Sequence, residues 1–282
     1  MDKYAVIGNP IKQSMSPVIH SAFATETNQD LEYGKLFAEA DNFKPVVDEF
    51  FAAGARGLNV TAPFKLDAFQ YADCLTERAR SAGAVNTLAL QEDGRLLGDN
   101  TDGPGLVSDI RDNLGWQIRG KKLLVLGAGG ATRGTLLPLL NEQPARLHIA
   151  NRTASKALQL AEDFQRFGSV TAGGLEDIPA GFDLIINASA AGLSGERPHI
   201  DASVVGPDCC VYDMVYGAEP TPFMRWAEPL GARTADGLGM LVGQAAEAFH
   251  LWRGVRPSEA PVQAMLREAL RKKRNAEAGE AG

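Results

Sequence analysis

A glycine-rich turn, LVLGAGGATRG at residues 124–134, limits the fold of this chain more than any other feature. It follows an apolar run and leads into a helical pattern, with Gly127, Gly129 and Gly130 at the bend. Glycines at such a place allow a tight turn and let backbone amides approach a pyrophosphate at the helix N-terminus. Thr132 stands in the third place of the G-x-G-x-x-G pattern, so a purely structural strand–helix turn remains an alternative. The strand before the turn and the helix after it favour a dinucleotide-binding unit.

A second segment, HIANRT at residues 148–153, bears on the kind of dinucleotide. NAD-binding chains usually place an acidic side chain at about this distance after the turn, where it bonds the adenosine ribose. Here the sequence offers Asn151, Arg152 and Thr153, with Lys156 following. A guanidinium can pair with a 2′-phosphate that an aspartate would repel, and Thr153 can cap the helix and donate its hydroxyl. The segment predicts NADPH as the ligand, with a pair of ordinary surface cations as the alternative.

Strand and helix patterns alternate in two series along the chain. Such alternation is typical of parallel sheets covered by helices. We expect strands at residues 3–9, 32–38, 57–63, 123–127, 146–151, 183–189 and 209–216, helices at 17–28, 43–54, 103–115, 239–254 and 257–274, and a hairpin at 88–98 around Asp93-Gly94. The predicted fold class is α/β, with an N-terminal substrate-binding domain (1–102 and 238–282) and a Rossmann-type domain (103–237). The terminal helices return to the first domain.

Composition excludes several other classes. The net charge of −7 comes with no basic stripe, so nucleic acid is an unexpected partner. No apolar run is long enough to cross a bilayer, and the start, MDKYAVIGNP, lacks the features of a signal peptide, so we expect a cytoplasmic protein. Three cysteines make no disulfide framework, and four scattered histidines show no metal-binding spacing. Monomer and homodimer are both compatible with the sequence.

Polar side chains gather in four short segments of the first series, NPIKQSMSP, NVTAPFK, AVNT and DNTDGPG. Most lie just beyond a strand, where open α/β sheets bind ligands. Ser14 and Ser16 can donate two hydroxyl hydrogen bonds to a carboxylate, although Ser16 can equally be a helix cap. Lys65 and Asp102 carry the strongest chemical signal, because a lysine can protonate an alkoxide while a carboxylate orients it. An ordinary ion pair is the alternative for these two residues.

Taken together, these motifs resemble the shikimate dehydrogenase family over residues 3–265. NPIKQSMSP, NVTAPFK, GAVNT, DNTDG, GAGGATRG, NRT and DGLGMLVGQAAEAF follow one another in the order and spacing of that family. The resemblance implies NADPH-dependent, reversible reduction of 3-dehydroshikimate to shikimate, in the pathway to aromatic amino acids.

The resemblance also implies a role for individual residues. Lys65 is the expected catalytic acid and base, assisted by Asp102. The substrate carboxylate is assigned to Ser14 and Ser16, and the ring hydroxyls to Asn59, Thr61, Asn86, Asp102 and Gln244. Tyr216 is expected to reach the substrate from the cofactor domain. The expected NADP-binding residues are Gly127, Ala128, Gly129, Gly130 and Ala131 at the pyrophosphate, Asn151, Arg152, Thr153 and Lys156 at the 2′-phosphate, Met214 and Gly237 at the nicotinamide, and Glu77.

Two departures from the family pattern are visible. Met15 stands where the family often has lysine, and Lys156 replaces a common arginine and loses the flat face that stacks on adenine. We expect Lys156 to loosen the discrimination against NAD without reversing it.

The alternative activities are a dehydrogenase that also accepts quinate and, more distantly, a non-catalytic regulator that binds NADPH. Arg152 argues against the first and the Lys65–Asp102 pair against the second.

Overall fold

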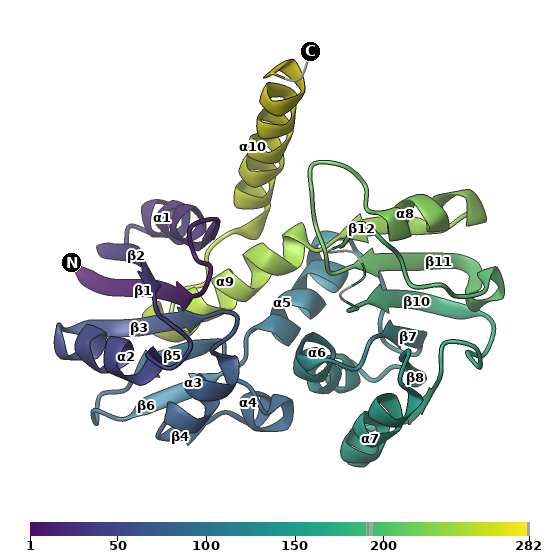
Figure 1. Ribbon diagram of the computed structural model, residues 1–282, viewed down its shortest axis with the longest axis horizontal. Helices are drawn as coiled ribbons and strands as arrows, with labels where there is room; N and C mark the ends of the chain where they lie inside the picture. Colours follow the sequence, from purple (N-terminus) through teal and green to yellow (C-terminus); the bar gives the residue numbers. More distant parts are fainter. Residues whose placement is uncertain (190, 192–193, 281–282) are drawn as a thin grey trace. The chain divides into compact units, whose positions relative to one another are not determined.

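The computed structural model describes residues 1–189, 191 and 194–280, which form two compact units (Figure 1). Unit 1 comprises Met1–Gly105 and Val242–Val262, and unit 2 comprises Leu106–Leu241 and the residues from Gln263 onward. The sequence analysis placed the boundaries three or four residues earlier and assigned the whole C-terminal segment to the first domain. In the structure, the segment from Gln263 groups with unit 2 instead.

Unit 1 is built on a six-stranded sheet in the order β2-β1-β3-β5-β6-β4. Its strands are β1 (Asp2–Gly8), β2 (Leu31–Phe37), β3 (Ala55–Val60), β4 (Cys74–Leu75), β5 (Thr87–Leu90) and β6 (Leu96–Asp99), and its helices include α1 (Ser16–Glu26), α2 (Phe43–Ala52), α3 (Lys65–Tyr71) and α4 (Glu77–Ala82). β1 pairs in parallel with β2 and β3, whereas β5 runs antiparallel to β3. The predicted hairpin is confirmed as β5–β6, with Gly94 at a φ of 83° in its turn.

Residues of β1 alternate between the two faces of this sheet, as a pleated strand requires. Ala5 and Ile7 pack in one apolar cluster with side chains of α2 and α3. Tyr4 and Val6 point to the opposite face, where they meet Tyr33 of β2 and Trp252. This alternation buries the sheet on both faces and leaves its strand ends to carry polar groups.

Unit 2 contains a second six-stranded sheet, whose strand pairs are all parallel. Its strands are β7 (Lys122–Leu126), β8 (Arg146–Ala150), β9 (Val170–Gly173), β10 (Phe182–Asn187), β11 (Val205–Asp213) and β12 (Arg233–Asp236), and its helices include α6 (Gly130–Asn141), α7 (Ala154–Phe164) and α8 (Pro222–Ala227). The order β12-β11-β10-β7-β8-β9 is that of the Rossmann fold. Strand order reverses between β7 and β10, and such a switch point is where these sheets bind ligands.

Two apolar clusters cover the faces of this second sheet. Leu123 and Val125 of β7 pack with α6 and α7 on one face. Leu124 and Leu126 pack with α8 on the other. Strands buried on both faces are typical of parallel sheets, which explains the continuous apolar runs in the sequence.

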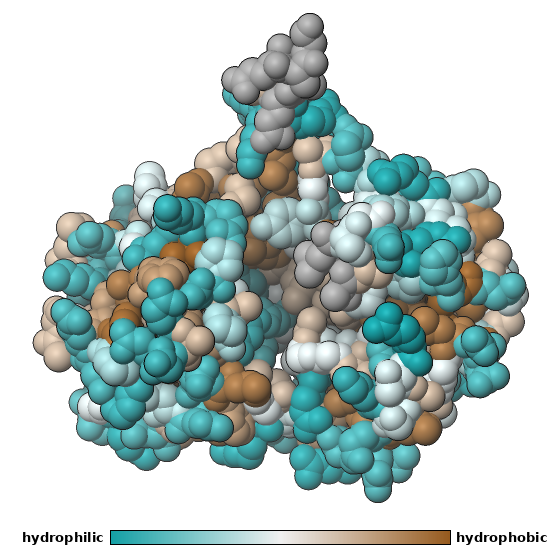
Figure 2. All heavy atoms as spheres, in the orientation of Figure 1, coloured by the Kyte–Doolittle hydropathy of each residue, from teal (hydrophilic) through white to brown (hydrophobic). Residues whose placement is uncertain are grey.

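Three α-helices remain in the described chain: α5 (Asp102–Ser108), α9 (Leu238–Arg253) and α10 (Glu259–Glu280). The chain passes from one unit to the other within each of them. α5 continues directly into a π-helical turn over Asp109–Asn113. Hydrophilic residues predominate on the face drawn in Figure 2, and the apolar ones there lie in scattered groups. Over the described ranges, no helix has the length and apolar character needed to cross a membrane.

Candidate active site

Lys65 and Asp102 form an ion pair in unit 1, with 2.6 Å between Lys65 Nζ and Asp102 Oδ2. Each is the first residue of a helix, Lys65 of α3 and Asp102 of α5. Their side chains are 34% and 16% exposed, so the pair is partly desolvated but open to a small molecule. The ammonium keeps two further N–H donors beyond the one that bonds Asp102. This geometry allows Lys65 to donate to a second acceptor.

Asn86 binds the other oxygen of the same carboxylate. Its Nδ2 donates to Asp102 Oδ1 at 2.9 Å, while its Oδ1 accepts from the backbone N–H of Thr101 at 2.9 Å. Asn59 lies opposite Thr87 in the β3–β5 pairing and donates to its hydroxyl at 3.1 Å. Because β5 runs antiparallel to β3, the start of β5 and the end of β3 meet at one edge of the sheet. The predicted residues Asn59, Asn86, Asp102 and Lys65 are therefore brought together there.

The two predicted serines lie side by side at the start of α1. Ser14 Oγ is 3.2 Å from Ser16 Oγ, and the Ser16 backbone N–H donates to Ser14 Oγ at 3.3 Å. Ser16 is the first helical residue, and Met15 occupies the cap position, so the alternative that Ser16 caps the helix is wrong. The serine hydroxyls are held at the helix N-terminus, which favours an anion.

Thr61 and Gln244 come from other elements of unit 1. Thr61 follows β3, and its backbone N–H donates to Ile7 O at the end of β1. A Cβ on Gly8 would lie 2.5 Å from the Thr61 methyl group, so the two strand ends pack closely. Gln244 lies on α9, and its backbone nitrogen packs so closely on Gly105 that a Cβ there would overlap it. The contact fixes Gln244 beside the first turn of the helix that begins at Asp102.

A cavity of about 1090 Å³ lies in unit 2 beyond the carboxyl ends of β7 and β10. Eight of the predicted cofactor residues line it, namely Gly127, Ala128, Gly129, Gly130, Ala131, Asn151, Arg152 and Met214. Gly127 has a φ of 112°, and a Cβ there would lie 3.1 Å from the Ala188 backbone. A side chain at this position would be both strained and crowded. The glycine turn, the start of α6 and the size of the cavity fit a dinucleotide.

Arg152 supplies a cationic group to this cavity. It is exposed at the C-terminal end of β8, and no ion pair engages it within the described residues. Thr153 occupies the cap position of α7, but its side chain makes no capping hydrogen bond in the part of the chain described, so that expectation is wrong. Lys156 is exposed on the first turn of α7, and neither it nor Thr153 is among the described lining residues.

Met214 and Gly237, both predicted at the nicotinamide, are in backbone contact. A Cβ on Gly237 would overlap the carbonyl oxygen of Met214, and the Gly237 N–H donates to Val215 O at 3.3 Å. Tyr216 follows two residues after Met214, and burial raises the pKa of its hydroxyl above the ordinary value. The hydroxyl is therefore a donor at physiological pH.

Asp213, which the sequence analysis did not single out, holds the segment that carries Met214. Its carboxylate is fully buried and accepts from the Thr221 hydroxyl at 2.6 Å, the Asn187 amide at 3.1 Å and the Val215 N–H at 3.2 Å. Burial raises the pKa of Asp213, and these hydrogen bonds oppose the shift. Asp213 is visible in the sequence as the residue directly before Met214, but a lone acidic residue in an apolar strand gives no sign of its partners.

Glu77 is the remaining predicted cofactor residue. It is exposed as the first residue of α4 in unit 1, where Thr76 caps the helix by accepting from Ala79 N. Its contact with the cofactor stays a prediction.

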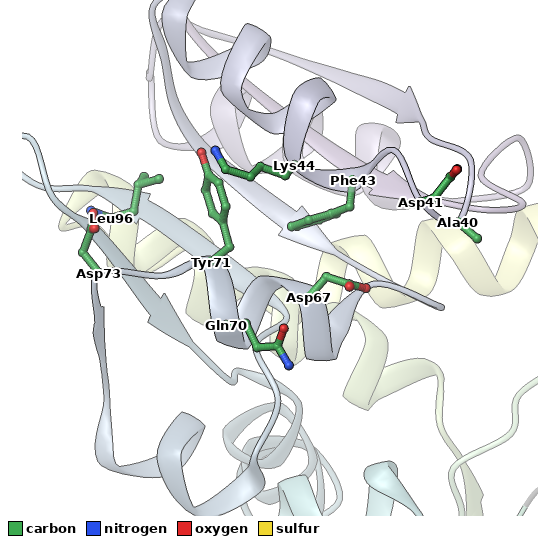
Figure 3. Close-up of a pocket in the computed structure, with 9 residues that line it drawn as sticks. All are labelled: Ala40, Asp41, Phe43, Lys44, Asp67, Gln70, Tyr71, Asp73 and Leu96. Atoms are coloured by element: carbon green, nitrogen blue, oxygen red, sulfur yellow. The ribbon is translucent and has the colours of Figure 1, made fainter.

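A separate cavity of about 560 Å³ lies in unit 1 between α2 and α3 (Figure 3). Lys44, Asp67 and Tyr71 are among its lining residues, and Lys44 Nζ lies 5.3 Å from the Tyr71 ring centre. Within the described chain, this cavity includes none of the residues predicted to bind substrate or cofactor.

Comparisons with known families cover most of the chain. The model of the shikimate dehydrogenase substrate binding domain matches residues 6–88. The model described as shikimate / quinate 5-dehydrogenase matches residues 109–194, and that of the shikimate 5'-dehydrogenase C-terminal domain matches 237–270.

Individual relatives agree over nearly their full length. The shikimate dehydrogenase (NADP(+)) of Saccharophagus degradans is 54% identical over 277 residues, covering 95% of this chain and 100% of the relative. An Ael1 enzyme from Pseudomonas putida has a similar structure, with a TM-score of 0.91 and 46% identity over 94% of this chain and 98% of the other. Shikimate 5-dehydrogenase from Thermus thermophilus, solved with NADP(H) and shikimate, gives a TM-score of 0.85 and 33% identity over 96% and 100% of the chains.

Proposed function

The chain belongs to the shikimate dehydrogenase family, and we propose that it catalyses the reversible, NADP-dependent interconversion of 3-dehydroshikimate and shikimate. Substrate binding and proton transfer are assigned to unit 1, and NADP binding to unit 2. The observation that carries the proposal is the 2.6 Å Lys65–Asp102 pair among amide and hydroxyl side chains. Bound NADPH supplies the hydride.

Lys65 is the proton donor of this proposal. As the carbonyl carbon gains a hydride, its oxygen becomes an alkoxide, and one N–H bond of the Lys65 ammonium breaks to give that oxygen its proton. Asp102 accepts a hydrogen bond from Lys65 throughout and so holds Nζ in place. In the oxidising direction, neutral Lys65 takes the proton back. A positioned acid or base of this kind contributes about 10²–10⁴ in rate.

The remaining polar residues of unit 1 hold the substrate. Ser14 and Ser16 donate their hydroxyls to its carboxylate, and their 3.2 Å separation suits two oxygens of one anion. Asn59, Thr61, Asn86, Asp102 and Gln244 bond the ring hydroxyls. A site built in this way rejects analogues that lack a hydroxyl, because buried donors and acceptors would be left without partners.

NADP is preferred over NAD because of the cation at the end of β8. Arg152 pairs with the adenosine 2′-phosphate, supported by Asn151, Thr153 and Lys156, while the amides at Gly127–Ala131 hold the pyrophosphate. Met214 and Gly237 lie at the nicotinamide end, Tyr216 reaches the substrate, and Glu77 contacts the cofactor. We expect the enzyme to act in the cytoplasm. It would be a monomer or a homodimer, which light scattering would distinguish.

A dehydrogenase that also oxidises quinate is the second candidate, since one matching family model is described as shikimate / quinate 5-dehydrogenase. A regulator that only binds NADPH is less favoured, because it has no need of the Lys65–Asp102 pair.

One spectrophotometric assay tests both alternatives. Purified protein is given shikimate or quinate with NADP⁺ or NAD⁺, and formation of the reduced nicotinamide is followed. We expect the shikimate–NADP⁺ combination to have the highest kcat/KM. Equal use of quinate would favour the second candidate. No turnover in any combination would reject the proposal that the protein is an enzyme.

A further inference from the structure

An unbroken series of hydrogen bonds in unit 1 leads from a buried tyrosine to the Lys65–Asp102 pair. The Tyr33 hydroxyl donates to Asn59 Oδ1 at 2.6 Å, and Asn59 Nδ2 donates to Thr87 Oγ1 at 3.1 Å. Thr87 Oγ1 donates to Asn86 Oδ1 at 2.9 Å, and Asn86 Nδ2 donates to Asp102 Oδ1 at 2.9 Å. Every donor in the series points toward Asp102.

The direction of this series follows from two fixed groups. The Thr101 backbone N–H donates to Asn86 Oδ1, so the Asn86 amide must turn its Nδ2 toward Asp102. Thr87 has a single hydroxyl proton, which it gives to Asn86, so it can only accept from Asn59. The Asn59 amide is thereby oriented with its oxygen toward Tyr33. Tyr33 completes the series as its first donor.

Tyr33 is held in a single environment at the start of this series. The residue is only 9% exposed, and its ring stacks on His20 with 4.2 Å between the centres and 6° between the planes. Neither buried His20 ring nitrogen has a partner with hydrogen-bond geometry among the described residues, and the polar group that acts on His20 is Asn59 rather than the Tyr33 hydroxyl. His20 therefore does not compete for the tyrosine proton. Burial raises the pKa of Tyr33 well above its ordinary value, with a smaller opposing effect from a hydrogen bond with Ser16. The hydroxyl therefore stays protonated and remains a donor.

We propose that Tyr33 is a positioning residue of the dehydrogenase, which orients Asn59 and, through Thr87 and Asn86, the Asp102 carboxylate beside Lys65. The proposal rests on the proposed function, because it assigns Tyr33 to the site where shikimate binds. Removing its hydroxyl frees the Asn59 amide to rotate and leaves its buried oxygen without a donor. Hydrogen bonds in such a series polarise one another, so the loss extends along it.

The test compares Tyr33→Phe with Tyr71→Phe in the shikimate–NADP⁺ assay. Tyr71 is a matched control, since its hydroxyl also bonds a partner, Asp48 at 2.7 Å, but at the separate cavity of Figure 3. We expect Tyr33→Phe to lower kcat/KM for shikimate by about threefold to thirtyfold, the range for a buried hydrogen bond, with KM for NADP⁺ unchanged. Tyr71→Phe should match the wild type. Kinetics of Tyr33→Phe that match the wild type for the folded protein, with only a lower melting temperature, would reduce Tyr33 to a packing residue and overturn the proposal.

A double-mutant cycle separates action through the series from independent effects. Thr87→Val interrupts the series between Asn59 and Asn86. If the hydrogen bonds act together, the factor by which kcat/KM falls in the double variant should be smaller than the product of the factors for the two single variants, by at least about threefold. Losses that simply multiply would overturn it. The wild-type assay distinguishes failure of the proposed function from failure of the positioning role. An inactive wild type refutes both, whereas an active wild type with an unaffected Tyr33→Phe refutes only the positioning role.

Discussion

Lys65 Nζ lies 2.6 Å from Asp102 Oδ2, although the two residues are 37 positions apart in the chain. The contact joins the first residue of α3 to the first residue of α5. The second oxygen of the same carboxylate is held by Asn86. The hydrogen bond from Asn86 fixes the carboxylate, and the carboxylate in turn fixes the ammonium that we assign to proton transfer.

Arg152→Ala tests the preference for NADP. The guanidinium has no ion-pair partner among the residues described and lines the nucleotide cavity. We expect the variant to raise KM for NADPH by about tenfold to a hundredfold, the worth of hydrogen bonds to a charged group, and to leave KM for NADH nearly unchanged. Steady-state kinetics with both cofactors measure this. Arg166→Ala, which removes an exposed arginine outside the cavity, should change neither constant. Equal increases for NADPH and NADH in Arg152→Ala would remove the assigned role.

Gly237→Ala tests the backbone contact with Met214 that we assign to the nicotinamide end. The added Cβ would overlap the Met214 carbonyl oxygen, so one of the two segments must move. We expect kcat to fall by up to about a hundredfold, because one of the two segments is displaced from its place in the site. The free energy of unfolding should fall by about 1–3 kcal/mol, because the added methyl group overpacks the contact. Assays and thermal melts check the two effects. Gly34→Ala is the control, because no atom lies within 4 Å of its Cβ position. A Gly237→Ala enzyme as active and stable as Gly34→Ala would contradict this account of the contact.

Buried His20 predicts how stability depends on pH. Burial lowers its pKa from 6.5 to about 3 in the folded chain. Below pH 6.5 the imidazole is protonated in the unfolded chain but stays neutral in the folded chain. The contribution of His20 to the free energy of unfolding is therefore complete above pH 6.5 and is lost as the pH falls toward 3. Between about pH 7 and about pH 5, the free energy of unfolding should decrease in both proteins. We expect the decrease to be about 2 kcal/mol smaller for His20→Phe than for the wild type. Urea denaturation at both pH values measures the difference. The exposed His250→Gln variant should follow the wild type, and a His20→Phe slope equal to the wild-type slope would reject the buried neutral imidazole.

Much of the fold could be predicted from local patterns. The strands of unit 2 are continuous apolar runs because both of their faces are buried, and the hairpin has Gly94 where the turn needs a positive φ. The two-residue strand β4 was not predicted, because two residues carry no period. The π-helical turn after α5 was also missed, since it continues the apolar spacing of a helix.

The site was predictable only in part, for a physical reason. Short polar motifs beyond strand ends identified Lys65 and Asp102, which the structure joins. Tyr33 and Thr87 lie inside strands rich in apolar or small residues, where a tyrosine or threonine is ordinary. Their importance comes from hydrogen bonds between elements distant in sequence, and no local pattern records such contacts.

The turnover of Lys65→Ala tests the central claim most directly. Shikimate oxidation by this variant is compared with the wild type and with Lys44→Ala, which removes an exposed lysine paired with Asp48. The account predicts that Lys65→Ala loses about 10²–10⁴ in kcat, with KM for shikimate little changed and Lys44→Ala fully active. A Lys65→Ala kcat within about twofold of the wild type would contradict it, because a general acid contributes far more than that.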